Sequence, residues 1–459
     1  MSRPIRWPFT LLLLAAIAGP VRAGEDPWRL GQALGVPAWL SLGGEYRVRL
    51  ENLDNQFRAG RRGGDQVLVH RTSLLARIDL PSARIVAEAL DARASLADAG
   101  TPLSTADVNP IDLLQAYLEL TLRDAPVTGG TSVLRLGRFT MDMGSRRLVA
   151  RNRYRNTINA FTGADWTITG ASQTQTRLFF VLPVQRLAGT NLLEAEAQAD
   201  DQSGDVRLWG FHHARGGLPA NSRGEFYVLG LDERDDDALA TRDRRLYTAG
   251  LRLYRDPVPG AFDFQIESAL QFGESRASAS AADRRDLDHR AHFQHVEVGY
   301  SFQRPWKPRL VVQYDYASGD DSPLDDENNQ FDTLFGARRF DFGPTGGYGA
   351  FARANISSPG LRLLLAPSAR VKIMAALRGF WLASDRDAWT GAGVRDATGN
   401  SGSYIGTQAE AEIRWSIIPG NLDLETGIAH VSGGGLMERP PGNGNGDPTY
   451  VFLAATFTF

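Results

Sequence analysis

The sequence predicts an all-β protein: a transmembrane antiparallel β-barrel of about 18 strands. Three observations predict it. Apolar and polar residues alternate with a period of two over many segments of nine or more residues. The polar faces of these segments carry charges of both signs, which suits a hydrated lumen. Short and long connections alternate along the chain, as they do in barrels that cross an outer membrane.

Residues 1–23 have the pattern of a secretory signal peptide. Arg3 and Arg6 precede a compact apolar run at 11–18, and the run is followed by Val21-Arg22-Ala23, a typical cleavage site. The alternative is a membrane anchor, but this run is too short to span about 30 Å of hydrocarbon. We expect the mature chain to leave the cytoplasm, with 24–40 as a short periplasmic segment and 41–459 as the barrel.

The composition excludes several classes of protein. The chain has 459 residues, no cysteine and a formal net charge of −3. It therefore has no disulfides and no thiolate sites, and its charge argues against a nucleic-acid partner. It also lacks the several runs of about 20 apolar residues that a helical membrane protein needs. Lys307 and Lys372 are the only lysines among 50 cationic side chains, so nearly every cation is a guanidinium.

Strand 41–51 illustrates the alternation, because Leu42 and Val48 share one face while Glu45 and Arg47 share the other. A soluble β-sandwich or β-helix also alternates, but strands near 9–11 residues favour a membrane barrel. The predicted strands are 41–51, 68–80, 83–95, 112–123, 132–139, 159–169, 174–182, 206–215, 223–232, 244–254, 261–273, 291–303, 308–318, 356–366, 369–383, 404–417, 421–432 and 448–459. The segment 320–358 could hide another hairpin or a loop folded into the barrel.

The connections predict the orientation. Short turns such as 81–82 and 419–420 would be periplasmic, and long polar loops such as 140–156 and 384–403 would be extracellular. These loops would face lipid and lipopolysaccharide of a bacterial outer membrane. The last strand ends at Phe459, a terminal aromatic that we expect the outer-membrane assembly machinery to read; the alternative is an ordinary edge strand. Barrels of 16–18 strands leave an aqueous channel.

The candidate functional residues are arginines. A run of arginines between 136 and 166 faces few acids. It is either a surface loop facing lipopolysaccharide or a cationic constriction folded into the lumen, where guanidinium groups would select carboxylates. The simpler alternative for any one residue is an ion pair with an inward acid. The predicted pore-lining residues are Arg138, Arg146, Arg147 and Arg151, with Arg47, Arg49, Arg135 and Arg414 as partners on the wall.

Two segments carry a family resemblance. LGRFTMDMGSRRLV at 136–149, with Asn156 and Phe161-Thr162-Gly163, resembles the hallmark segment of the alginate-export family of outer-membrane porins, and FWLASDRDAW at 380–389 is a second match. The resemblance implies a monomeric eighteen-stranded barrel that passes an anionic polyuronate through an arginine-lined channel. Arg138, Arg146 and Arg147 carry over by position. Phe139-Thr140 stands where the family usually has a polar, Gln-Glu-like pair after Leu-Gly-Arg. The family is broad, so the resemblance does not identify the solute.

Three rival functions remain. A generic porin for other small solutes fits the same barrel. An outer-membrane hydrolase could use His212-His213, or His430 with Ser432, but no Gly-x-Ser-x-Gly motif supports it. A barrel with a filled lumen is the third, and wall glycines such as Gly250 and Gly427 predict open space instead. We therefore expect no catalytic residue, metal or cofactor, and an anionic saccharide or carboxylate as the solute.

Overall fold

The computed structural model describes residues 26–459, except 99, 172, 188–191, 236–238 and 440–445. The predicted signal peptide at 1–23 lies outside the described residues. The described residues that precede the barrel contain the short helix α2 (Leu30–Ala33). They lie at the end of the barrel that carries the short turns, which we call the turn end; the opposite end, with the long loops, is the loop end.

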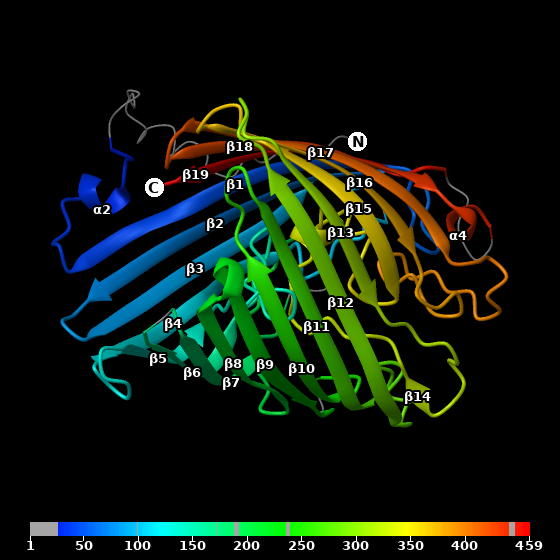
Figure 1. The fold of residues 1–459 in the computed structure, drawn as a ribbon, viewed down its shortest axis with the longest axis horizontal. Coiled ribbons are helices and arrows are strands. Elements are labelled where there is room, and N and C mark those ends of the chain that lie inside the picture. The colour runs from blue at the N-terminus through cyan, green and yellow to red at the C-terminus, as the bar shows by residue number, and fades with distance from the viewer. Residues whose placement is uncertain (1–25, 99, 172, 188–191, 236–238, 440–445) are drawn as a thin grey trace.

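In the described part of the chain, eighteen long strands form one closed antiparallel barrel (Figure 1). Each strand pairs with its neighbours in sequence, and β1 pairs with β19 to close the ring. The predicted strands lie within a few residues of the observed ones. These are β1 (Leu40–Asp54), β2 (Asp65–Asp79), β3 (Ala83–Ser95), β4 (Asn109–Arg123), β5 (Thr131–Phe139), β6 (Phe161–Thr169), β7 (Gln175–Pro183), β8 (Val206–Leu218), β9 (Ser222–Glu233), β10 (Arg245–Arg255), β11 (Phe262–Ser275), β12 (Leu287–Ser301), β13 (Arg309–Ala317), β15 (Ile356–Leu365), β16 (Val371–Trp381), β17 (Tyr404–Ile418), β18 (Leu422–Gly433) and β19 (Thr449–Thr458).

The connection between β13 and β15 is a folded-in loop rather than another hairpin. It contains β14 (Glu327–Asn328), which runs parallel to β12, and the short helix α3 (Arg339–Phe342). The remaining short helices are η1 (Pro219–Asn221) and α4 (Gly435–Glu438). No helix in the described part of the chain is long and apolar enough to cross a membrane.

The strand faces follow the predicted alternation. On β1, Arg47, Arg49 and Glu51 point into the barrel and are buried, whereas Leu50 points outward. Leu251 and Leu270 also lie on the outer face, where they are 62% and 60% exposed. An apolar outer band over a charged inner wall is the pattern expected of a membrane barrel.

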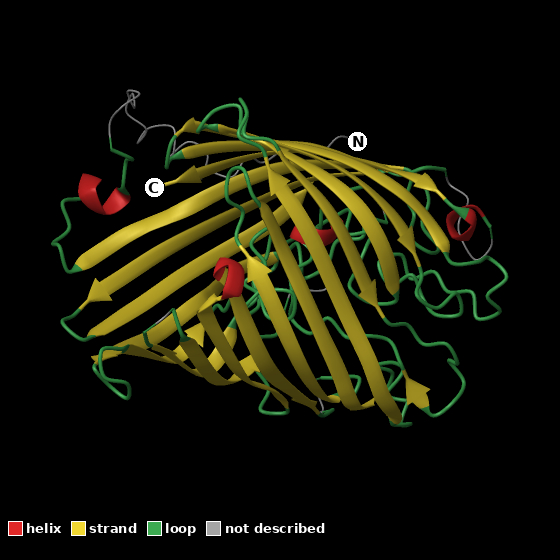
Figure 2. Cartoon of the chain, in the orientation of Figure 1, coloured by secondary structure: helices red, strands yellow, loops and turns green. Residues whose placement is uncertain are grey.

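The loop end of the barrel is filled by its own loops. Two of them, the 140–160 loop between β5 and β6 and the 318–355 loop between β13 and β15, run inside the ring of strands (Figure 2). Their apolar side chains join inward wall residues in one large buried cluster that includes Met141, Leu148, Phe342, Phe351, Phe293 and Phe380. The lumen at this end is therefore a packed interior with cavities rather than a wide water-filled pore.

The expectation that wall glycines leave open space is wrong. A Cβ added to Gly250 would lie 2.2 Å from the ring of Tyr227, and one added to Gly427 would lie 2.6 Å from the ring of Phe452. These glycines make room for a neighbouring aromatic side chain, which keeps the strands close and the wall packed.

The barrel seam at the turn end is covered by residues from both ends of the described chain. Phe459 is 7% exposed and packs on the backbone of Gly44, while Asn421 binds the backbone of Trp28 and Thr458. Because Phe459 is buried once the ring is closed, any protein that recognises its side chain must do so before closure.

Candidate functional site

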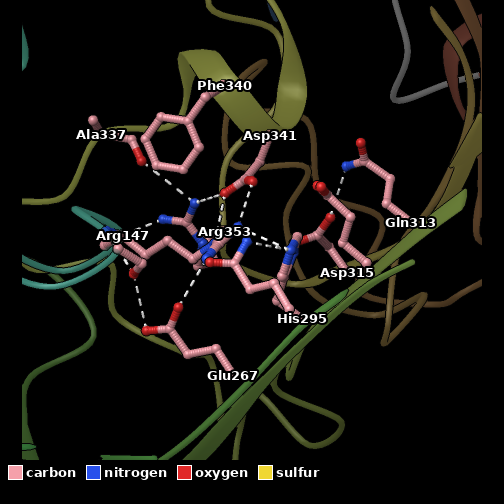
Figure 3. A network of polar contacts seen from close by, with 12 residues as sticks. Arg147, Glu267, His295, Gln313, Asp315, Ala337, Phe340, Asp341 and Arg353 are labelled. Carbon is pink, nitrogen blue, oxygen red and sulfur yellow. Dashed lines mark hydrogen bonds and ion pairs between the residues drawn. The ribbon is translucent and has the colours of Figure 1, made fainter. Parts of the chain in front are cut away.

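The two inner loops are joined to the wall by a buried network of charges (Figure 3). Arg147 on the 140–160 loop donates to Asp341 on α3 and to Glu267 on β11, both at 2.8 Å. Arg353 donates to the same Asp341 carboxylate. Arg147 and Arg353 are 2% and 1% exposed, so these contacts are made away from water.

The network continues through His295 on β12. Its Nε2 lies 2.9 Å from Arg147 Nη2, and its Nδ1 lies 2.7 Å from Asp315 on β13. A neutral imidazole satisfies both contacts, because Nε2 accepts from the guanidinium and Nδ1–H donates to the carboxylate. Arg378 completes the set by donating to Asp315 at 2.7 Å. Three guanidinium groups thus face three carboxylates, so the charges of these six side chains balance.

Ligand atoms of His295, Asp315 and Asp341 lie within 4.8 Å of one another. Each of them already faces a guanidinium: His295 and Asp341 contact Arg147, and Asp315 contacts Arg378. These contacts hold the inner loops against the wall. Burial alone would raise the pKa of the Asp341 carboxyl, but the charge of Arg147 holds that pKa below its ordinary value. The cluster therefore has a structural role, and it fits a metal poorly because its ligand atoms already have partners.

A polar cavity of about 440 Å³ lies between the loops at the loop end. We call it the loop cavity. Its lining comes from five separate loops, and its charged side chains are Arg58, Asp107, Arg155, Arg338 and Arg353. Arg353 is paired with Asp341 in the buried network, so three further cations face one acid and the cavity keeps a net positive charge.

The guanidinium groups of the loop cavity crowd one another. A Cβ built on Gly349 would lie 3.0 Å from Arg338 Nη2 and 3.9 Å from Arg58 Nη2. Arg338 donates to the carbonyl of Gly349, and Arg58 donates to the carbonyls of Gly347 and Tyr348, so both groups are held by backbone dipoles. Two cations side by side with carbonyl partners form a site that a carboxylate would neutralise.

The pKa values of the loop cavity reflect its excess of buried positive charge. Burial, reinforced by neighbouring arginines, lowers the pKa of Arg58 and of Arg338 to about 10 each and that of Arg155 to about 9. All three remain protonated at neutral pH. Burial raises the pKa of Asp107 to about 6, and the charge of Glu51 adds to this shift.

A second cavity of about 390 Å³ lies at the turn end, on the other side of the segment 336–340. We call it the turn-end pocket. Gly336 and Arg338 line the loop cavity, whereas Arg339 and Phe340 line the turn-end pocket. This short stretch of the 318–355 loop is therefore the partition between the two cavities.

The predicted pore-lining arginines lie in several different places. Arg47 donates to the carbonyls of Arg153 and Arg155, and Arg49 pairs with Glu51 at 2.6 Å. On β5, Arg135 pairs with Glu119 and Arg138 with Asp112.

The other four predicted residues divide between the loops and the turn end. Arg151 pairs with Glu88 at 2.9 Å, Arg147 belongs to the buried network, and Arg414 pairs with Glu412 at the turn-end pocket. Arg146 differs, because it is exposed and its guanidinium lies 5.1 Å from the centre of the Phe340 ring.

Sequence reasoning missed the cations of the loop cavity. Arg58 shares its loop with Arg61 and Arg62, and Arg338 is followed directly by Arg339. The two loops are 280 residues apart by number, and nothing in either sequence distinguishes the arginine that lines the cavity from its neighbours. Arg155 belongs to the arginine run that was recognised, but the pattern could not separate it from its neighbours.

Both family-like segments serve to pack the loops. Asn156 is fully buried and donates to the carbonyls of His70, Arg93 and Asp107, which ties the 140–160 loop to the ends of β2 and β3. Trp389 donates to the carbonyl of Ala350 at 2.8 Å and so holds the 318–355 loop. These motifs specify a barrel with folded-in loops.

The histidines considered for hydrolysis have other partners. His430 Nδ1 lies 2.9 Å from the hydroxyl of Thr449, and His212 lies 3.4 Å from Glu225.

Comparisons with known proteins agree with this architecture. A family model described as alginate export matches residues 38–446. No curated protein matches the chain. Among solved structures, Pseudomonas aeruginosa OpdQ aligns with a TM-score of 0.57 at 12% identity, covering 92% of this chain and 97% of its own. Acinetobacter baumannii OccAB1 aligns with a TM-score of 0.55 at 11% identity, covering 91% of this chain and 97% of its own. At these identities, the likeness is one of fold.

Proposed function

The chain belongs to the alginate export family, and from this we propose that it passes anionic, carboxylated solutes across the bacterial outer membrane through the loop cavity. The coarser statement, an outer-membrane β-barrel channel, follows from the family and the fold. The observation that supports the finer one is the crowding of Arg58, Arg155 and Arg338 around one cavity. An alginate-like polyuronate is one such solute.

The proposed mechanism is transient charge neutralisation. A carboxylate that enters the loop cavity meets guanidinium groups whose pKa values are lowered by burial and, to a smaller extent, by neighbouring arginines, and its negative charge stabilises their protonated forms. Contact is brief because Arg338 and Arg58 keep their carbonyl partners, so the solute does not have to satisfy every donor. Conduction requires binding that is favourable on entry and weak enough for exit.

The remaining partners belong to the same proposal. Outer-membrane lipid and lipopolysaccharide would surround a monomeric barrel, and the assembly machinery would read Phe459 before the seam closes. Phe459 is buried in the closed barrel, which is consistent with early recognition.

The test is the reversal potential of single channels in a planar bilayer under a KCl gradient. We expect the wild-type channel to favour chloride, and Arg155→Gln/Arg338→Gln to reduce the chloride-to-potassium permeability ratio about threefold or more. Arg153→Gln is the matched control, because Arg153 is exposed on the same loop. A cation-selective wild type, or a double variant that keeps the full selectivity, would overturn the proposal in favour of a generic porin.

The pH dependence of selectivity gives an independent prediction. The pKa of Asp107 is raised to about 6, so its carboxylate is charged at pH 7.5 and protonated at pH 5. Acidification removes the one negative charge of the loop cavity, and chloride selectivity should therefore rise between pH 7.5 and pH 5. Asp107→Asn should be more chloride-selective at pH 7.5 and nearly flat across this range. An equal pH response in wild type and variant would assign the titration to other groups.

A further inference from the structure

The turn-end pocket combines an apolar wall with cations. Its lining comes from β15, β16, β17, the turn before β13 and the partition segment. The side chains of Phe340, Leu364 and Met374 make the apolar part. Such a wall suits a hydrocarbon or an aromatic ring better than the hydroxyl-covered faces of a sugar.

Both lysines of the chain line this one pocket. Lys307 lies in the turn before β13, Lys372 lies at the start of β16, and both are exposed. Arg362 on β15 adds a guanidinium, which donates to the carbonyl of Phe340 at 2.7 Å. Among the described residues, no carboxylate lies within ion-pair distance of these three cations.

The acids of the pocket are already paired. Glu410 accepts from Arg339 at 2.7 Å, and Glu412 is shared between Arg339 and Arg414. The pocket therefore keeps a net positive charge beside its apolar wall.

We propose that the turn-end pocket is a binding site for carboxylates that carry an apolar body, such as a monocarboxylate on an aromatic ring. The apolar body lies against Phe340, Leu364 and Met374, and the carboxylate faces Lys307, Lys372 and Arg362. The site deepens the proposed channel function by naming a solute class, and it rests on that function only for its role in transport. Binding itself depends on the pocket alone.

The experiment measures protection of the two lysines from acylation. The purified full-length barrel in detergent is treated with a water-soluble N-hydroxysuccinimide acetate, and acetylation of the peptides that contain Lys307 and Lys372 is followed by mass spectrometry. Benzoate, glucuronate and acetate are compared at equal concentration and ionic strength, because they carry the same charge on different bodies. Benzoate should slow acetylation of both lysines about fivefold or more at saturation, with much smaller effects of glucuronate and acetate.

Variants at Met374 separate the apolar contact from the charge. Met374→Gln keeps the length of the side chain and should abolish the preference for benzoate, whereas Met374→Leu should retain it. Equal protection by all three anions, or protection by none, would overturn the proposal. Failure of the two proposals is distinguishable, because benzoate-specific protection can occur in a barrel whose selectivity does not respond to Arg155→Gln/Arg338→Gln.

Discussion

Replacing Arg147 by methionine should loosen the two inner loops while leaving the barrel closed. The substitution keeps much of the side-chain length but leaves Glu267 buried without its cation, and Asp341 then depends on Arg353 alone. An uncompensated buried charge costs about 3–5 kcal/mol. The backbone hydrogen bonds between the strands are unchanged. The substitution therefore destabilises only the contact between the inner loops and the barrel wall.

Two measurements report this change. Trypsin should cleave Arg147→Met after Arg338 or Arg339, which are half-buried in the wild-type barrel, whereas the barrel should keep its heat-modifiable migration in a gel. Single-channel conductance should rise about twofold or more, because loops that fill the lumen no longer stay in place. The control is Arg153→Met, which removes an exposed arginine from the same loop.

The cause of the Arg147→Met effect can be tested by a second substitution. Glu267→Gln removes the unpaired charge and keeps a side chain that Ser145 and Tyr227 can still contact, as they contact the glutamate now. Arg147→Met/Glu267→Gln should therefore be less sensitive to trypsin than Arg147→Met. Simple additivity of the two substitutions would show that the ion pair does not hold the loop.

The strands could be predicted because their signal is local. A strand such as β18 shows alternation of apolar and polar residues within its own twelve residues, and its neighbours in the barrel, β17 and β19, are its neighbours in sequence. The turns and loops follow from the same pattern, so the closed ring was predictable.

The site could not be predicted with the same detail because its contacts are distant in sequence. Arg147 and Asp341 are 194 residues apart, and Arg147 and Glu267 are 120 apart. The arginine-rich run marked the 140–160 loop as unusual, but composition could not tell that Arg147 would be buried with acids while Arg146 stayed exposed. That distinction depends on the path of the 318–355 loop, which carries no periodic signal.

Replacing Gly336 by alanine tests the same loop contact by sterics instead of charge. A Cβ at this position would lie 1.8 Å from the carbonyl oxygen of Arg147, because the two loops run side by side with backbone bonds from Phe335 to Leu148 and from Ala337 to Arg146. The overlap involves backbone on both sides, so one loop must move, at a cost of about 3 kcal/mol.

Gly336→Ala should therefore share the two effects of Arg147→Met, which are cleavage by trypsin at the partition segment and higher conductance. It should also weaken the chloride preference, since Arg338 moves with its loop. Gly204→Ala is the matched control, because a Cβ there meets nothing within 4 Å. If Gly336→Ala behaved as Gly204→Ala does, the close approach of the two loops would not control the channel. If it opened the channel as Arg147→Met does, two unrelated physical perturbations would converge on one contact, and that contact would be what keeps the partition between the cavities closed.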